Sequence, residues 1–222
     1  MTPRAILFDL DGTLVDSARS ILAGLGRALE SEGVAPAVPL SPRLIGPPLP
    51  RTLATLAGSS EPVLIERLAA AFRLHYDTTG YRETEVYAGV GDMLSSLARK
   101  GLALFIVTNK RIKPTRLIID HLGWQAHFRG IHALDALEPP AADKTALVCE
   151  VLRRESLTSA HTWMVGDSAE DRQAAEGNGL KFLAATWGYG AAAADQQDLA
   201  SRLATPLELL QRVSAYSAGR TP

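Results

Sequence analysis

The chain has a single cysteine among its 222 residues, Cys149, so it cannot form an intramolecular disulfide. It also lacks an apolar run of the roughly 18 residues that a membrane-spanning helix needs, and it does not open with the pattern of a secretory leader. We therefore expect a protein of the reducing cytoplasm that works away from membranes. Because Cys149 stands among apolar residues, we expect it to be a small buried side chain.

An excess of positive charge is also missing. The 23 Lys and Arg residues stand against 24 Asp and Glu residues, which gives a formal net charge of −1. Nucleic-acid binding usually needs a basic surface, so the composition gives no support for a nucleic-acid partner. A length of 222 residues suits one large domain, or a core with a small insertion.

The most informative stretch is an apolar run, residues 5–8, that is followed by Asp9, Asp11 and Gly12. The run is long enough for a strand buried on both faces. At a strand spacing of two, Asp9 and Asp11 point the same way and bring two like charges together. An isolated Asp-x-Asp-Gly sequence is most often a turn. Here the acids alternate with large apolar residues, which favours a functional site over a turn.

The pattern further along the chain alternates between buried strands and amphipathic helices. We expect the further strands at residues 102–107, 130–133, 162–165 and 182–186, the last of them ending the sheet. We expect the helices at residues 17–32, 51–57, 61–76, 92–100, 114–122, 143–155 and 170–176. Ser17 is expected to cap the first helix. This alternation predicts an α/β fold with a mostly parallel sheet covered by helices.

Residues 17–86, called the helical block below, show no convincing strand pattern. They include a proline-rich stretch, residues 36–50, that cannot form a regular helix. The helical block therefore reads as an insertion between two strands of the sheet.

Polar side chains follow the predicted strands where ligands bind in parallel sheets, outside the carboxyl ends. Thr108 and Asn109 follow one strand, and Asp167 and Asp171 follow another. Mg²⁺ prefers such oxygen ligands, which Asp9, Asp167 and a backbone carbonyl could supply. Asp167 could instead serve only as a helix cap, since Ser168 and Glu170 open a helix.

A phosphate group near these acids would also need a fixed positive charge. Lys144, at the start of a predicted helix, is the favoured cation, and the Thr108 hydroxyl could donate to a phosphate oxygen. Three other cations compete with Lys144 for this role, namely Lys110, Arg111 and Lys113.

One motif resembles a known family. The residues Asp9-Leu10-Asp11-Gly12-Thr13-Leu14-Val15-Asp16-Ser17 resemble the first motif of the haloacid dehalogenase superfamily, in its phosphatase branch. Thr108 resembles the second motif, Lys144 the third, and Gly166-Asp167-Ser168-Ala169-Glu170-Asp171 the fourth. The resemblance implies a Rossmann-like core, residues 1–16 and 87–222, with an inserted α-helical cap domain, residues 17–86.

The resemblance also implies roles for the site residues. Asp9 would be the nucleophile that becomes an aspartyl phosphate, and Asp11 the general acid and then the general base. The cofactor would be Mg²⁺, held by Asp9, the Asp11 backbone carbonyl, Asp167 and, through the metal's waters, Asp171. The phosphate-binding and substrate-binding residues would be Thr108, Asn109, Lys144, Gly12, Gly46 and Pro47.

The segment Ile45-Gly46-Pro47-Pro48-Leu49 resembles the cap of phosphoglycolate-phosphatase-like members. Dehalogenases of the superfamily lack a carboxylate at the position of Asp11, so its presence favours phosphoryl transfer. We therefore expect a Mg²⁺-dependent phosphatase acting on a small phosphorylated metabolite, as a monomer or homodimer. The alternatives are a phosphomutase of the β-phosphoglucomutase type, a nucleotidase or pyrophosphatase of the same superfamily, and a non-catalytic phosphate-binding or phospho-acceptor module.

Two further expectations concern the surroundings of this site. Residues 188–193, Gly-Tyr-Gly-Ala-Ala-Ala, match a loose dinucleotide-binding pattern, but too little chain follows for the required βαβ unit. We expect a flexible loop there. Arg43, Arg51 and Arg73 in the helical block are candidates for contacts that select the substrate.

Overall fold

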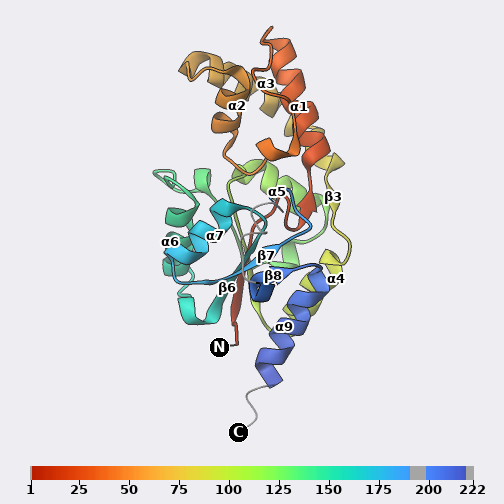
Figure 1. The fold of residues 1–222 in the computed structure, drawn as a ribbon, viewed down its shortest axis with the longest axis vertical. Helices are drawn as coiled ribbons and strands as arrows, with labels where there is room; N and C mark the ends of the chain where they lie inside the picture. The colour runs from red at the N-terminus through yellow and green to blue at the C-terminus, as the bar shows by residue number, and fades with distance from the viewer. Residues whose placement is uncertain (1, 191–198, 219–222) are drawn as a thin grey trace.

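The structure is a computed structural model that describes residues 2–190 and 199–218. Within these residues, six strands form one parallel sheet and there are eight α-helices (Figure 1). In sheet order, the strands are β5 (Gly130–Ala133), β4 (Ala103–Thr108), β1 (Ala5–Phe8), β6 (Thr162–Gly166), β7 (Lys181–Ala185) and β8 (Arg202–Leu203). The predicted α/β fold with a parallel sheet is confirmed.

Strand β1 lies inside the sheet, between β4 and β6, and all four of its residues are buried. Phe8 at its end is level with Val165 of β6, and both neighbouring strands run parallel to β1. Because parallel strands end at the same edge of a sheet, the polar residues at these ends meet there. The register therefore explains why Asp9, Thr108 and Asp167 lie close together.

Helices cover both faces of the sheet and form a three-layer core. One face packs against α4 (Val90–Arg99), α5 (Ile112–His121) and α9 (Pro206–Ala218). The other face packs against α6 (Lys144–Arg154) and α7 (Ala169–Gly177). Alternate residues of β1 point to opposite faces, as expected for a strand, so Phe8 joins the first core and Leu7 the second.

The helical block stands at one end of the molecule, above the carboxyl edge of the sheet (Figure 1). Its helices are α1 (Ala18–Ser31), α2 (Leu49–Ala57) and α3 (Pro62–Tyr76), with 3₁₀ turns at Pro42–Leu44 and Gly80–Glu83. It has a hydrophobic cluster of its own, which includes Leu25, Leu53, Leu68 and Phe72. No helix in the described part of the chain is both long and apolar enough to cross a membrane.

The prediction that residues 17–86 contain no strand was wrong at one point. Glu85–Val86 forms β3, which pairs antiparallel with β2 (Val15–Asp16). The two short strands pair where the chain leaves the core for the helical block and where it returns to the core. Two residues are too few to show an alternating pattern, so the sequence carried no periodic signal for them.

Two further predictions fail near the C-terminal end of the fold. The strand at Lys181–Ala185 is not the last one, because β8 and α9 follow it. Cys149 is exposed rather than buried, because the buried stripe of α6 runs through Leu147, Val148 and Val151. One step along a helix turns a residue by about 100°, which places Cys149 outside that stripe.

Candidate active site

A buried ion-pair cluster lies at the carboxyl edge of the sheet. Asp9 follows β1 directly, and its backbone N–H donates to the Val165 carbonyl oxygen at 2.9 Å. Lys144, the first residue of α6, places its Nζ 2.7 Å from Oδ1 of Asp9 and 2.5 Å from Oδ1 of Asp171. All three of these charged side chains are buried. The structure therefore brings Lys144 to the site, as the sequence analysis favoured.

Asp171 is held by the start of α7. Ser168 is the N-cap of this helix, and its hydroxyl and backbone N–H both contact Oδ2 of Asp171, at 2.7 and 3.0 Å. The backbone N–H of Asp171 donates to the Ser168 hydroxyl, which completes a capping box. Ser168 is therefore the N-cap residue of α7, and Asp167 does not cap this helix.

Asp167 completes a group of carboxylates with the spacing of a metal site. One oxygen from each of Asp9, Asp167 and Asp171 lies within 4.8 Å of the other two. The Asp11 side chain is not part of this group. Three buried hard-oxygen donors are the kind of ligand set that Mg²⁺ takes.

The charges of this group also call for a cation. Burial raises the pKa of Asp9 to about 7, although Lys144 opposes the shift. Burial, and then the charges of Asp171 and Asp9, raise the pKa of Asp167 to about 8. Burial alone would lower the pKa of Lys144, but Asp171 and Asp9 raise it above its ordinary value. Three ionised carboxylates would carry more negative charge than one ammonium balances, so Asp9 and Asp167 hold their protons to higher pH. A divalent cation would offset this excess negative charge and favour the ionised forms.

Two glycine-containing segments close around Asp167. Gly12 has φ of +83°, and a Cβ there would overlap the Asp167 carboxylate. A Cβ on Gly188 would overlap the Gly12 carbonyl oxygen and the Asp167 side chain. The Gly190 backbone N–H donates to Oδ2 of Asp167 at 3.0 Å. Only residues without a side chain allow this approach.

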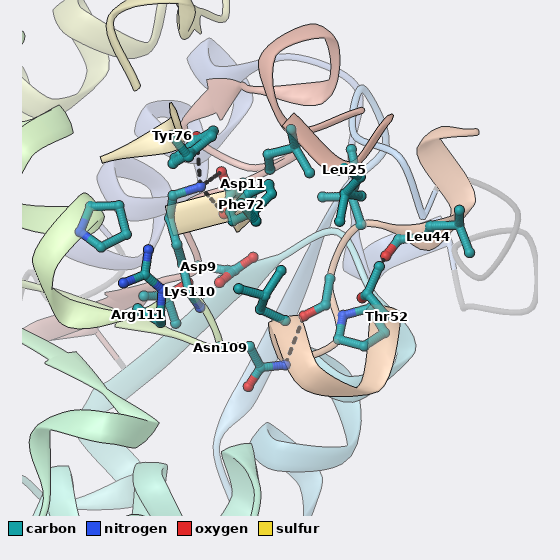
Figure 2. A pocket seen from close by; sticks show the side chains of 17 residues that line it. Asp9, Asp11, Leu25, Leu44, Thr52, Phe72, Tyr76, Asn109, Lys110 and Arg111 are labelled. Carbon is teal, nitrogen blue, oxygen red and sulfur yellow. Dashed lines mark hydrogen bonds and ion pairs between the residues drawn. The ribbon is translucent and has the colours of Figure 1, made fainter. Parts of the chain in front are cut away.

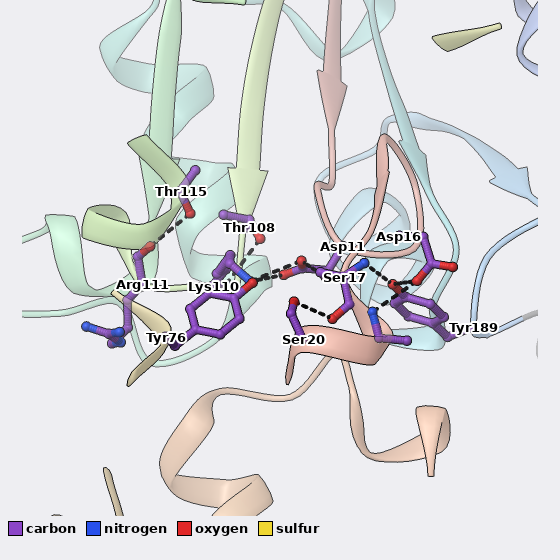
Figure 3. A network of polar contacts seen from close by, with 11 residues as sticks. Asp11, Asp16, Ser17, Ser20, Tyr76, Thr108, Lys110, Arg111, Thr115 and Tyr189 are labelled. Carbon is purple, nitrogen blue, oxygen red and sulfur yellow. Dashed lines mark hydrogen bonds and ion pairs between the residues drawn. The ribbon is translucent and has the colours of Figure 1, made fainter. Parts of the chain in front are cut away.

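Residues 188–190 therefore form part of the site, which the prediction of a flexible loop did not include. Tyr189 contributes as well, because its hydroxyl contacts the Ser17 backbone N–H at 2.7 Å and Asp16 at 2.8 Å (Figure 3). Residues 191–193 of the same predicted loop lie outside the described residues. The sequence signal that could have indicated this role is a Gly-x-Gly sequence that follows a strand ending at the ligand-binding edge.

Asp11 lies in a separate network on the side of the helical block (Figure 3). Both of its carboxylate oxygens lie 3.1 Å from Nζ of Lys110, and the Ser17 hydroxyl donates to Oδ1. Ser17 occupies the N-cap position of α1, but its hydroxyl makes no capping bond. The prediction that Ser17 caps this helix through its side chain was therefore wrong, because the side chain is engaged by Asp11.

Thr108 and Asn109 lie side by side at the end of β4. The Thr108 hydroxyl oxygen accepts the Lys110 backbone N–H at 3.1 Å, which leaves its own hydrogen free to donate. The Asn109 side-chain Nδ2 donates to the Gly46 carbonyl oxygen at 3.0 Å and to Glu170 at 2.7 Å. Asn109 thus ties the helical block to the core.

A cavity of about 70 Å³ lies between the helical block and the core (Figure 2). This is room for a few water molecules or a small organic group. Gly46 and Pro47 line it, together with Asp9, Asp11 and Thr108. Its remaining lining is mostly apolar and comes from both parts of the molecule: Ile21, Leu25, Leu44, Ile45, Leu49, Thr52, Phe72, Tyr76, Asn109, Lys110, Arg111 and Pro114.

The other basic candidates from the sequence occupy separate places in the structure. Arg43 lines a second and more open hollow that Asp11 and Tyr189 also border. Arg51 lies at the surface, where it pairs with Glu170 at 3.1 Å. Arg73 pairs with Glu66 on the outside of α3 and lines neither of these hollows. Lys113 is exposed and 3.7 Å from Asp77.

Known proteins are similar to this chain in sequence and fold. The family model described as haloacid dehalogenase-like hydrolase matches residues 6–185. The phosphoglycolate phosphatase of Rhodobacter capsulatus is 35% identical over 190 residues, which are 83% of this chain and 85% of that protein. A solved haloacid dehalogenase-like hydrolase from Streptococcus pneumoniae has a TM-score of 0.82 and 28% identity, over 95% of this chain and 98% of that one.

A relative with a different name is the tyrosine-protein kinase PtkA of Mycobacterium tuberculosis. It is 31% identical over 192 residues, which are 86% of this chain. The match covers 65% of that protein's length, so the relative has sequence that this chain does not match. The family match extends over most of the chain and includes Asp9, Thr108, Lys144 and Asp167. The chain therefore belongs to the haloacid dehalogenase-like hydrolase family.

Proposed function

We propose that the chain is a Mg²⁺-dependent phosphatase that hydrolyses a small organic phosphate monoester through an aspartyl phosphate on Asp9. The observation that carries the proposal is the buried contact between Asp9 and Lys144, with Asp167 and Asp171 beside it. An anionic nucleophile and an anionic phosphate can approach one another only where positive charge offsets their repulsion. This site has one fixed cation, the Lys144 ammonium, and three carboxylates that could hold a second cation, Mg²⁺.

In the first step, a carboxylate oxygen of Asp9 forms a bond to phosphorus while the bond from phosphorus to the ester oxygen breaks. Asp11 gives its proton to that oxygen, which leaves as an alcohol. In the second step, Asp11 takes a proton from a water molecule, and the water oxygen bonds to phosphorus. The bond to Asp9 then breaks, which releases phosphate and restores both carboxyl groups.

The remaining residues bind and orient the phosphoryl group. Lys144 would contact its oxygens while holding Asp9 in place, and the free hydrogen of the Thr108 hydroxyl would donate to another oxygen. Asp9, Asp167 and Asp171 would hold Mg²⁺, together with the Asp11 backbone carbonyl. When bound, the metal offsets the negative charge of the phosphate. Asn109 is placed to keep the helical block closed over these groups, through its bond to Gly46.

The proposed substrate is a small phosphorylated metabolite. The cavity beside Asp11 has about 70 Å³, which suits a short leaving group. The helical block supplies much of the lining of this cavity, so we propose that residues 17–86 act as a cap that excludes water. The phosphoglycolate phosphatase relative supports a substrate of this size.

The name of the PtkA relative favours a second candidate, phosphoryl transfer to a hydroxyl other than that of water. A phosphomutase would be one such transferase. It would use the same Asp9 chemistry, but it would retain the phosphoryl group until an acceptor arrives.

Phosphate release from a panel of small esters tests the proposal, with Mg²⁺ or with excess EDTA, for the wild type and for Asp9→Asn. We expect repeated turnover that needs the metal and is lost in Asp9→Asn, which keeps the shape of the side chain but not its charge. Turnover that survives in Asp9→Asn would overturn the assignment of the nucleophile. Loss of ester without release of phosphate would favour the transferase.

A further inference from the structure

Lys110 is a buried cation that the proposed chemical steps do not use. Its side chain is 8% exposed. Its Nζ lies 3.1 Å from both Asp11 oxygens and 2.9 Å from the Tyr76 hydroxyl, and it stands 4.5 Å from the centre of the Tyr76 ring (Figure 2). Burying a lysine is costly unless it is paired. Asp11 and Tyr76 supply this pairing, so the ammonium is held in place at the wall of the cavity.

The charges around the cavity single out Lys110. Two of the lining residues are basic, Lys110 and Arg111. Arg111 is already held by both carboxylate oxygens of Asp77, one at 3.1 Å. Lys110 is therefore the basic lining residue that contacts Asp11, and its ammonium is held there by the Asp11 carboxylate and the Tyr76 hydroxyl. The apolar side chains around it weaken competition from water, so an anion placed here would interact strongly with it.

The position of Asp11 fixes how far Lys110 is from the leaving group. In the proposed mechanism, Asp11 gives its proton to the ester oxygen, so that oxygen lies within hydrogen-bond distance of the carboxyl group. The Lys110 ammonium touches the same carboxyl group. It can therefore reach a group attached to the carbon next to that oxygen. In the monoester of a 2-hydroxy acid, a carboxylate occupies this place.

We propose that Lys110 determines substrate specificity by binding a carboxylate on the carbon that carries the phosphate ester, which selects monoesters of small 2-hydroxy acids. Tyr76 is a positioning residue, since its hydroxyl and ring hold the ammonium at Asp11 from the side of the helical block. This inference rests on the proposed function, because it uses Asp11 to place the ester oxygen.

The test compares two small esters. One is 2-phosphoglycolate, which has the carboxylate, and the other is ethylene glycol monophosphate, which has an uncharged hydroxymethyl group in its place. For each protein we take the ratio of kcat/KM for 2-phosphoglycolate to kcat/KM for ethylene glycol monophosphate. This ratio is then compared between the wild type and Lys110→Met. A hydrogen bond between two charged groups predicts a fall in this ratio of roughly 10- to 100-fold. Lys110→Arg keeps the charge and should restore much of the ratio. Lys113→Met removes an exposed lysine nearby and should leave the ratio unchanged.

Tyr76→Phe gives a second and milder variant. It should raise KM for 2-phosphoglycolate several-fold with a smaller effect on kcat, because it frees the ammonium without removing it. Equal losses on both esters in Lys110→Met would overturn the proposal and leave Lys110 with a structural role.

Calorimetric binding separates this inference from the proposed function. If the wild type hydrolyses neither ester, the proposed function fails, but the binding of 2-phosphoglycolate can still be compared between the wild type and Lys110→Met. Binding of 2-phosphoglycolate that is weakened selectively in Lys110→Met supports the carboxylate site. Binding that is unchanged in Lys110→Met, or absent in the wild type, overturns it.

Discussion

Lys144 Nζ lies 2.7 Å from Oδ1 of Asp9, although 135 positions of the chain separate the two residues. The contact forms because β1 and the start of α6 meet at the same edge of the sheet. A buried ammonium between two carboxylates serves both the fold and the proposed chemistry.

Replacement of Lys144 should therefore affect both stability and activity. Lys144→Met leaves Asp9 and Asp171 without their cation, so we expect a loss of about 3 kcal/mol in the free energy of unfolding. We also expect kcat/KM to fall by at least roughly 100-fold. Urea denaturation and initial-rate assays measure the two effects. Lys113→Met is the matched control, since that lysine is exposed. Lys144→Met behaving like the control would contradict this account.

A glycine substitution tests the close packing at Asp167. In Gly188→Ala the new methyl group would overlap the Gly12 carbonyl oxygen and push Asp167 away from the other carboxylates. We expect metal-dependent activity to fall roughly 100-fold, as small displacements at a reacting centre can do. Gly91→Ala is the control, because α4 offers open space there, and it should stabilise the protein by about 0.5 kcal/mol. Full activity in Gly188→Ala would show that the loop is not needed.

The raised pKa values predict how stability depends on pH without metal. The pKa of Asp9 is about 7 and that of Asp167 about 8, against an ordinary value of 3.8. The folded state therefore holds protons that the unfolded state releases, and this favours folding at low pH. We expect the metal-free protein to lose stability as the pH rises from about 4 to about 8.

Added Mg²⁺ should reverse this trend, because the metal competes with protons for the same oxygens. The increase in melting temperature caused by Mg²⁺ should be larger at about pH 9 than at about pH 6. Thermal unfolding with Mg²⁺ and with EDTA measures it. Asp167→Asn should remove the effect, whereas Glu66→Gln, which changes an exposed acid of α3, should keep it. An equal or larger increase at the lower pH would argue against the carboxylate site.

Cys149 provides a test of the arrangement of α6. Because its side chain is exposed, a thiol reagent should modify the folded protein rapidly and at one thiol per chain. The modified protein should keep its activity, since Cys149 lies outside the buried stripe that packs on the sheet. Reaction only after unfolding would show that Cys149 is buried, as we expected from the sequence.

The sequence predicted the parts of the site that rest on strand ends. Asp9, Thr108 and Asp167 follow apolar runs, so the α/β pattern alone brings them to one edge. The burial of Lys110 was not predictable in this way. It depends on Tyr76, which lies 34 positions earlier in the chain and meets Lys110 only through tertiary packing. Among the competing cations, the sequence could not show that Lys110 and Lys144 would occupy separate positions.

The sequence analysis missed other elements, either because they are short or because their pattern was overlooked. Strands β2, β3 and β8 have two residues each, which is too short for a periodic pattern. Helix α9 does carry a helical pattern, with Pro206 first and Leu209 and Val213 buried, so its omission was an error of reading. Gly188 and Gly190 were discounted because they failed as a dinucleotide site, although a strand end at this edge gave them another reason to be glycine.

The central claim is that Asp9 carries the phosphoryl group, and trapping that intermediate tests it most directly. In Asp11→Asn the second step lacks its base, while p-nitrophenyl phosphate has a leaving group that needs no proton. Reaction of this variant with that ester and Mg²⁺, followed by an acid quench and peptide mass spectrometry, should show one phosphoryl group on Asp9. The double variant with Asp9→Asn should show none. A phosphoryl group on another residue, or rapid turnover with no phosphorylated Asp9 in any quench, would contradict the account.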